Sequence, residues 1–270
     1  IVVSDEQLKK LTEKELKKEI ESSVQTFNYQ INSMTGASGQ SPFITLSMYL
    51  NDFKDSPKEK EDLAMLIEEF FKQRIKGIKN KAGHYVTQTF PKLIYVLEDD
   101  NVYEGQNYFW LTKLAAECTA KRMVPDYISE KVMLDKKKNS KGESTVVIPM
   151  GCRSILSVLE NEPTKTWGRF NIGVATLNLP YIALESKGNP EEFWKLLDYY
   201  AELIKEVQVI RYKKLCGVPS DVAPVLWQFG AYARLQPGET IDKLLTKNYS
   251  TISLGYAGLF EAVKYLTGYS

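Results

Sequence analysis

Short apolar runs alternate with long helical patterns along this chain, and the alternation limits the possible folds more than any other feature. In the helical patterns apolar side chains recur at steps of three and four residues, whereas the short runs are rich in β-branched residues. Strands that are separated by helices pair in parallel through crossover connections. The order therefore favours an α/β sheet or partial barrel over a β-sandwich or a helical bundle.

Caps and turn residues set the boundaries of these elements. Ser4 and Gln7 have the spacing of a capping box, and prolines follow the N-cap candidates Ser56 and Asn189. The predicted helices cover residues 4–30, 57–76, 107–122 and 189–210, with a last helix beginning near Tyr256. The predicted strands cover residues 43–49, 93–97, 145–148, 172–177 and 251–254.

One apolar segment ends abruptly in a turn that carries a cysteine. Residues 147–156 have the sequence VIPMGCRSIL. Pro149 is expected to break a strand, Gly151 permits a positive φ angle, and the pair Arg153-Ser154 rarely occupies a core. These flanks favour a chemically available Cys152 over the small buried hydrophobe that a single cysteine usually is.

The chain has three widely spaced cysteines, Cys118, Cys152 and Cys216, which fit a reducing compartment better than a disulfide framework. Cys118 falls on the apolar stripe of a predicted helix and is expected in the core, and Cys216 lies at a helix end and is expected to be structural. There is no CxxC motif, and His84 is the only histidine. No metal site built from protein ligands is therefore expected.

Charge and hydropathy argue against two classes of partner. Lys and Arg total 35 against 34 Asp and Glu, a formal net charge of +1, so no overall field would attract nucleic acid or an anionic membrane. Lys136-Lys137-Lys138 is interpreted as a solvated loop. Neither a membrane-spanning run nor the apolar region of a signal peptide is visible. We expect a cytoplasmic protein that binds neither membrane nor nucleic acid.

Four sequence blocks follow one another in a characteristic order. The turn around Cys152 lies between residues 32–43, NSMTGASGQSPF, and residues 168–180, GRFNIGVATLNLP, and residues 253–258 read SLGYAG. Together the blocks resemble the anaerobic (class III) ribonucleoside-triphosphate reductases, glycyl-radical enzymes that make deoxynucleotides without oxygen. The resemblance extends over essentially the whole chain.

The resemblance implies an α/β barrel of ten strands, made of two half-barrels with a thiol-bearing loop inside. Residues 1–270 would form a single catalytic-core segment, the second half-barrel and finger loop, of a longer chain. The N-terminal half-barrel and the C-terminal glycyl-radical domain would be absent, because the family's Cys-Gly-Tyr radical loop, its cysteine-only zinc site and its second active-site cysteine do not occur in this sequence. The isolated segment is expected to be inactive.

The same resemblance assigns catalytic roles. Cys152 would form a thiyl radical that takes the 3′-hydrogen of the ribose and later returns it. Asn171 would orient the ribose hydroxyls and the reductant, with Asn178 as the reserve candidate, and Met150 favours formate as reductant. The alternative for Asn171 is an asparagine that only satisfies a strand end.

Two glycine-containing turns are predicted to bind the substrate. Gly255, Tyr256 and Gly258 lie where a strand meets a helix, so that backbone N–H groups and the helix dipole can hold the triphosphate. The other rim of the substrate site would be formed by Ser33, Gly36, Gly39 and Gln40.

The resemblance also implies partners. Ribonucleoside triphosphates, nucleotide effectors and a radical-SAM activating enzyme would bind, and the complete enzyme would be a homodimer. The segment itself would hold no cofactor. The complete enzyme would need a glycyl radical, formate and a structural zinc in the C-terminal region outside this sequence.

Two other interpretations stay open. The first is another glycyl-radical enzyme, similar to pyruvate formate-lyase, although such enzymes often have adjacent cysteines at the loop tip, whereas Cys152 stands alone. The second is a non-catalytic nucleotide-binding or regulatory module in which Cys152 is incidental.

Overall fold

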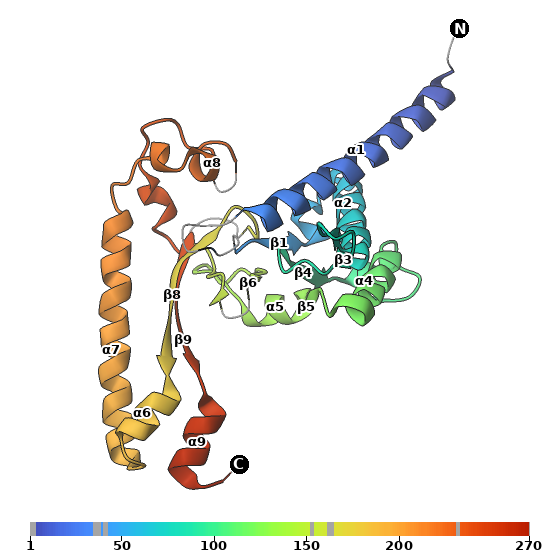
Figure 1. Ribbon diagram of the computed structural model, residues 1–270. Coiled ribbons are helices and arrows are strands. Elements are labelled where there is room, and N and C mark those ends of the chain that lie inside the picture. The colour runs from blue at the N-terminus through green and yellow to red at the C-terminus, as the bar shows by residue number, and fades with distance from the viewer. Residues whose placement is uncertain are drawn as a thin grey trace. The chain divides into compact units, whose positions relative to one another are not determined.

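The computed structural model describes residues 4–34, 39, 43–151, 154–160, 165–230 and 233–269 (Figure 1). The chain divides into two compact units, residues 1–137 and 138–270. Each unit is described by itself. No helix in the described ranges is long and apolar enough to cross a membrane.

The first unit contains a three-stranded parallel sheet. Its strands are β1 (Thr45–Met48), β4 (Lys92–Leu97) and β5 (Asp126–Ser129), in the order β1-β4-β5. The central strand β4 is buried along most of its length, as expected of a parallel strand that is covered on both faces. The remaining elements of this unit are α1 (Asp5–Ser33), η1 (Leu50–Phe53), α2 (Pro57–Lys76), the hairpin β2 (Ile78–Lys79) and β3 (Tyr85–Val86), α3 (Asp99–Val102), α4 (Phe109–Arg122) and α5 (Glu130–Lys136).

Local sequence signals explain where the helices of this unit begin. The Ser4 side chain accepts a hydrogen bond from the Gln7 N–H, and the Gln7 side chain accepts one from the Ser4 N–H, which confirms the predicted capping box. Helix α2 begins at Pro57 as predicted. Helices α2 and α4 and strand β4 enclose a core that contains Phe71 and Cys118, both fully buried, so the expectation for Cys118 is confirmed.

The second unit is built around two parallel strands, β8 (Phe170–Asn178) and β9 (Ser250–Ala257), with a bulge between Asn171 and Gly173. The long helix α7 (Pro190–Leu215) lies beside this pair (Figure 1). The other elements are the antiparallel strands β6 (Pro149–Met150) and β7 (Ser154–Ile155), and the helices α6 (Leu179–Glu185), η2 (Ser220–Val222), α8 (Pro224–Trp227), η3 (Ile241–Leu244) and α9 (Leu259–Thr267).

Helix α7 approaches one face of the β8–β9 pair closely. Gln208 Nε2 donates to the carbonyl oxygens of Gly173 and Ser253, at 3.2 and 3.1 Å. A Cβ atom at Gly173 would lie 2.6 Å from Arg211 Nη1, so a larger residue there would displace the end of the Arg211 side chain. Helix α7 therefore lies against one face of the pair, which leaves the opposite face free of this helix.

Several sequence predictions need correction. Residues 145–148 are not a strand, and Pro149 pairs with Ile155 instead of ending the ladder, since a proline carbonyl can still accept. The last helix begins at Leu259, not near Tyr256, because Tyr256 is still paired with β8.

Three further elements differ from expectation. Lys136 is the last residue of α5, so the lysine run is not wholly a loop. Cys216 caps the end of α7 as predicted but is exposed. The described residues form one three-stranded and three two-stranded sheets, which agrees with the α/β class but does not show a ten-stranded barrel.

Candidate functional site

The hairpin of β6 and β7 brackets the predicted thiol turn. Met150 lies opposite Ser154, and Gly151 has the predicted positive φ angle, +64°. The Met150 side chain packs against the apolar cluster that includes Phe170 at the start of β8. The hairpin therefore reaches the strand that carries Asn171. Cys152 itself lies outside the described residues.

Asn171 lies near the start of β8, and its amide faces β9. Its Nδ2 donates to Thr251 Oγ1 at 2.9 Å and to Ser253 Oγ at 2.7 Å. Since side chains alternate along a strand, Thr251 and Ser253 lie on one face of β9 and Ile252 and Leu254 on the other. The face that carries Asn171 is thus a neutral, hydrogen-bonding surface.

Asn178, the reserve candidate, ends β8 and caps α6. Its Oδ1 accepts a hydrogen bond from the N–H of Tyr181 at 3.2 Å. An N-cap asparagine has this geometry without any ligand.

The predicted phosphate turn is partly strand. Gly255 and Tyr256 pair with Thr176 and Leu177 inside the β8–β9 ladder. Gly258 is the N-cap of α9 with φ +77°, and a Cβ atom there would lie 2.3 Å from Pro180 Cγ. Close packing of α9 on α6 therefore already requires glycine at this position.

The predicted amide and the predicted phosphate turn lie at opposite ends of the strand pair. Asn171 is opposite Thr251, which precedes Gly258 by seven residues on the chain. At a rise of about 3.3 Å per residue the two sites are roughly 20 Å apart. No small group can touch both, so only an extended ligand along the strands would join them.

The residues predicted for the other rim belong to the first unit. Ser33 is the exposed last residue of α1, and its Oγ donates to the Gln30 carbonyl at 3.1 Å. Gly39 has φ +74°, and an added Cβ atom would have no atom of the described residues within 4 Å. Gly36 and Gln40 lie outside the described residues. A substrate site that these four residues share with Asn171 stays a prediction.

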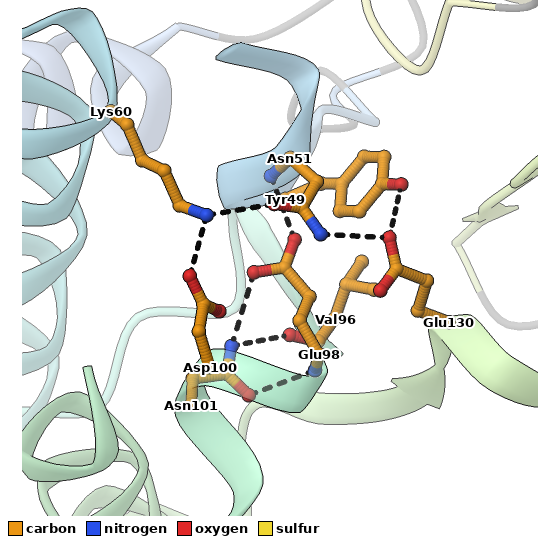
Figure 2. Close-up of polar contacts among 8 residues, drawn as sticks. All are labelled: Tyr49, Asn51, Lys60, Val96, Glu98, Asp100, Asn101 and Glu130. Atoms are coloured by element: carbon orange, nitrogen blue, oxygen red, sulfur yellow. Dashed lines mark hydrogen bonds and ion pairs between the residues drawn. The ribbon is translucent and has the colours of Figure 1, made fainter. Parts of the chain in front are cut away.

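The structure also reveals a polar cluster that sequence reasoning missed, at the carboxyl ends of β1, β4 and β5 (Figure 2). Glu98 is 2% exposed; its Oε1 accepts from the backbone N–H of Asn51 at 2.8 Å. Burial raises the pKa of Glu98 to about 8, against the lowering effect of the Asn51 N–H, and Glu130 and Asp100 add to the rise. Glu98 therefore retains its proton near neutral pH.

Asn51 connects the rest of this cluster. Its Nδ2 donates to Glu130 Oε1 at 3.0 Å, and its Oδ1 accepts from Lys60 Nζ at 2.7 Å (Figure 2). Tyr49 donates to Glu130 at 2.6 Å, and burial together with this bond raises the pKa of Tyr49 far above its usual range. Polar residues after each strand were a usable signal, but β5 had not been predicted.

One pair of opposite charges lies within the cluster. Lys60 Nζ lies 2.5 Å from Asp100 Oδ2. Within the described ranges no group of three or more histidine, cysteine, aspartate or glutamate side chains is placed to hold a metal ion. The cluster can therefore fix the loops that follow the three strands.

Comparison with known proteins identifies the family. The family model NRDD, anaerobic ribonucleoside-triphosphate reductase, matches residues 4–270. This chain belongs to that family. It is 36% identical over 256 residues to the anaerobic ribonucleoside-triphosphate reductase of Escherichia coli K12, a match that covers 93% of this chain and 34% of that protein. Its identity with the protein of the same name from enterobacteria phage T4 is 36% over 253 residues, 90% of this chain and 39% of that protein.

Solved structures of a family member have a similar fold. The anaerobic ribonucleotide reductase from Thermotoga maritima with citrate in the active site matches with a TM-score of 0.55 and 19% identity, over 92% of this chain and 41% of that chain. The same enzyme with glycerol in the active site gives a TM-score of 0.57 and 16% identity, over 93% and 38%. The chain spans little more than a third of the curated relatives it matches.

Proposed function

We propose that this chain supplies the thiol turn and the ribose-facing strands of an anaerobic ribonucleoside-triphosphate reductase. The observation that carries the proposal is the neutral face of β8 and β9, where Asn171 donates to Thr251 and Ser253 beside the hairpin that brackets Cys152. Membership of the reductase family makes a pyruvate formate-lyase-like activity the weaker alternative.

In this proposal Cys152, as a thiyl radical, takes the ribose 3′-hydrogen and returns it at the end. The 2′-hydroxyl takes up a proton and leaves as water while Asn171 holds the neighbouring hydroxyl, and formate gives up two electrons and its hydrogen to the ribose and leaves as carbon dioxide, so that one proton from solution is consumed overall. The glycyl radical of the complete enzyme would accept the hydrogen atom of the Cys152 thiol, which would leave the unpaired electron on the sulfur. A neutral face suits this chemistry, because it orients hydroxyl groups without exchanging protons with them.

Nucleotides are the proposed ligands. The Thermotoga maritima reductase has been solved with dATP and CTP, at a TM-score of 0.51. We therefore infer nucleoside triphosphates as substrates and nucleotide effectors as regulators here. A radical-SAM activating enzyme, homodimerisation and a cytoplasmic location belong to the same proposal.

The proposal includes a barrel that extends beyond the described strands. Ile252 and Leu254 of β9 are 42% and 51% exposed, and with α7 they line an apolar groove of about 500 Å³. Further strands and helices of a half-barrel would cover such a surface.

The experiment that tests the function is the Cys152→Ser variant of the intact protein that contains this sequence, assayed with activating enzyme, formate and nucleoside triphosphate. We expect turnover to vanish while nucleotide affinity changes less than about twofold, because an alkoxyl radical does not replace a thiyl radical. Cys118→Ala and Cys216→Ala should retain turnover. Deoxynucleotide formation by Cys152→Ser would refute the proposal, and nucleotide binding with no dependence of any turnover on Cys152 would favour the regulatory module.

A further inference from the structure

A buried arginine lies where the Cys152 hairpin, β8 and β9 come together. Arg169, directly before β8, is 6% exposed. Its Nη2 donates to the carbonyl oxygens of Ser157 at 2.5 Å and Asn248 at 2.6 Å, and its Nε donates to the Tyr249 carbonyl at 3.0 Å. One guanidinium thus joins the segment that leaves the hairpin to the segment that enters β9.

The acceptor side of this contact has an unusual backbone. Lys247 and Asn248 have φ angles of +52° and +63°, which residues other than glycine seldom adopt. This left-handed turn precedes β9 and presents two successive carbonyl oxygens, those of Asn248 and Tyr249, to Arg169. Asparagine adopts this conformation more readily than most residues, but Lys247 has no such local preference, and the charged donor Arg169 stabilises the turn from outside it.

Neighbouring bonds connect the same segments. Asn248 Nδ2 donates to the Val158 carbonyl at 3.2 Å, the Glu160 N–H donates to the Lys247 carbonyl at 3.3 Å, and the Tyr249 hydroxyl donates to the Gly168 carbonyl at 2.7 Å. All of these bonds lie between residues 157–160, 168–169 and 247–249. The three segments therefore form one fastened junction, which we call the Arg169 junction.

The chemistry of the junction calls for arginine in particular. A guanidinium donates from several nitrogens in a rigid plane, whereas a lysine ammonium donates from a single atom. Burial lowers the pKa of Arg169 to about 10, so the side chain is still charged at neutral pH. Its Nη1 is buried and has no hydrogen-bond partner among the described residues, so one of its donor groups does not take part in this geometry.

We propose that Arg169 is a positioning residue. It holds residues 154–160, the arm that follows the Cys152 turn, against the end of the β8–β9 pair that carries Asn171. The effect on catalysis that we infer rests on the proposed function. Asn171 lies two residues after Arg169, and Cys152 lies five residues before Ser157. A thiol and an amide that act on the same ribose must keep their separation, and an error of about 1 Å costs on the order of 100-fold in rate.

The test compares Arg169→Lys with wild type in the intact protein that contains this sequence. Hydrogen exchange of residues 154–160 and 247–250 should accelerate by about tenfold or more, while α7 changes less than about twofold. In the turnover assay kcat should fall about 100-fold and KM for the nucleotide should change less than about threefold.

Two more variants keep the test decisive. Asn248→Gly keeps the positive φ angle but removes the bond to Val158, so it should give the same two effects at smaller size even if Arg169→Lys fails to fold. Arg122→Lys is the matched control: Arg122 donates from Nε and Nη2 to the Ile75 carbonyl in the first unit, so its loss should speed exchange near Ile75 and leave kcat unchanged.

Specific outcomes would overturn the positioning role. Unchanged exchange at residues 154–160 would show that Arg169 does not hold the arm, and faster exchange with unchanged kcat would show that the arm need not be held. A loss that appears in KM alone would make Arg169 a substrate-binding residue instead. If Cys152→Ser retains turnover, the proposed function fails, yet the exchange experiment still reports on the junction.

Discussion

The parallel strands of the two units differ in burial and in the number of strands beside them. In the first unit, residues Leu93 to Val96 of β4 are at most 1% exposed, with a strand on either side. In the second, β9 leaves Leu254 51% and Tyr256 60% exposed, and within the described residues it pairs with β8 alone. The central strand β4 thus has a neighbour on each side, whereas β9 has an unpaired edge and an exposed apolar face among the described residues, which the further strands of the proposed barrel would cover.

The units also place polar groups differently. Titratable side chains gather in the first unit where the strands end: Lys60 pairs with Asp100 and Asn51, and Glu98 accepts from the Asn51 N–H (Figure 2). The second unit carries neutral groups, Asn171 among them, on one face of the strand pair near the start of both strands. The first arrangement fastens loops, and the second can bind uncharged hydroxyl groups of a ligand.

The largest expected effect compares one leucine in each sheet. Leu93→Ala in β4 should lower the free energy of unfolding by about 2 to 5 kcal/mol, because it leaves a cavity in a buried core. Leu254→Ala in β9 should cost less than about 1 kcal/mol, because that side chain is half exposed. Urea denaturation of both variants measures the difference. Equal decreases in the free energy of unfolding would show that Leu93 and Leu254 do not differ in burial as described.

The next effect concerns packing at the end of β9. Gly258→Ala should destabilise the protein by about 2 to 3 kcal/mol, because its Cβ would overlap Pro180 and its φ angle is positive. Gly188→Ala is the control: φ is +78° there, but the nearest atom, Tyr265 Cε1, is 3.8 Å from the new Cβ, so about 1 kcal/mol is expected. Thermal unfolding compares the two. If the two losses match, the α6–α9 contact is looser than described.

The third effect depends on pH. Folding raises the pKa of Glu98 from 4.5 to about 8, so in this interval the folded protein keeps a proton that the unfolded chain releases. Stability should therefore fall as pH rises from about 5 to 8, and Glu98→Gln, which cannot titrate, should remove on the order of 1 to 3 kcal/mol of that fall.

Unfolding curves at several pH values measure this slope. Glu202→Gln, which removes an exposed carboxylate of the second unit beside Lys205, should leave the slope as it is in wild type. A Glu98→Gln slope equal to that of wild type would show that the cluster of the first unit does not hold a proton.

The smallest effect concerns Asn178 and distinguishes a role as helix cap from a role in catalysis. Asn178→Ala should cost about 1 kcal/mol, because the N–H of Tyr181 loses its acceptor, and Asn178→Asp should be close to neutral. Denaturation and turnover are measured side by side. A strong loss of turnover in Asn178→Asp, with unchanged stability, would assign Asn178 to the ribose site rather than to the cap.

The sequence by itself determined the local features. The Ser4 and Gln7 capping box and the Asn189 cap of α7 join groups at most three residues apart, so a pattern of a few letters predicts them. Burial of Cys118 followed from helical periodicity in the same way. The four blocks around Cys152 also predicted the family, which the comparison confirms.

Only the tertiary structure decided which distant groups meet. Asn51 and Glu130 are 79 residues apart, and Arg169 and Tyr249 are 80 apart, so strand pairing and not local pattern brings them together. The same holds for Gly258, whose need for glycine comes from Pro180 on another helix. A one-dimensional pattern records the geometry of one turn or strand, whereas buried pKa shifts and close approaches arise from chain segments that only the folded core makes neighbours.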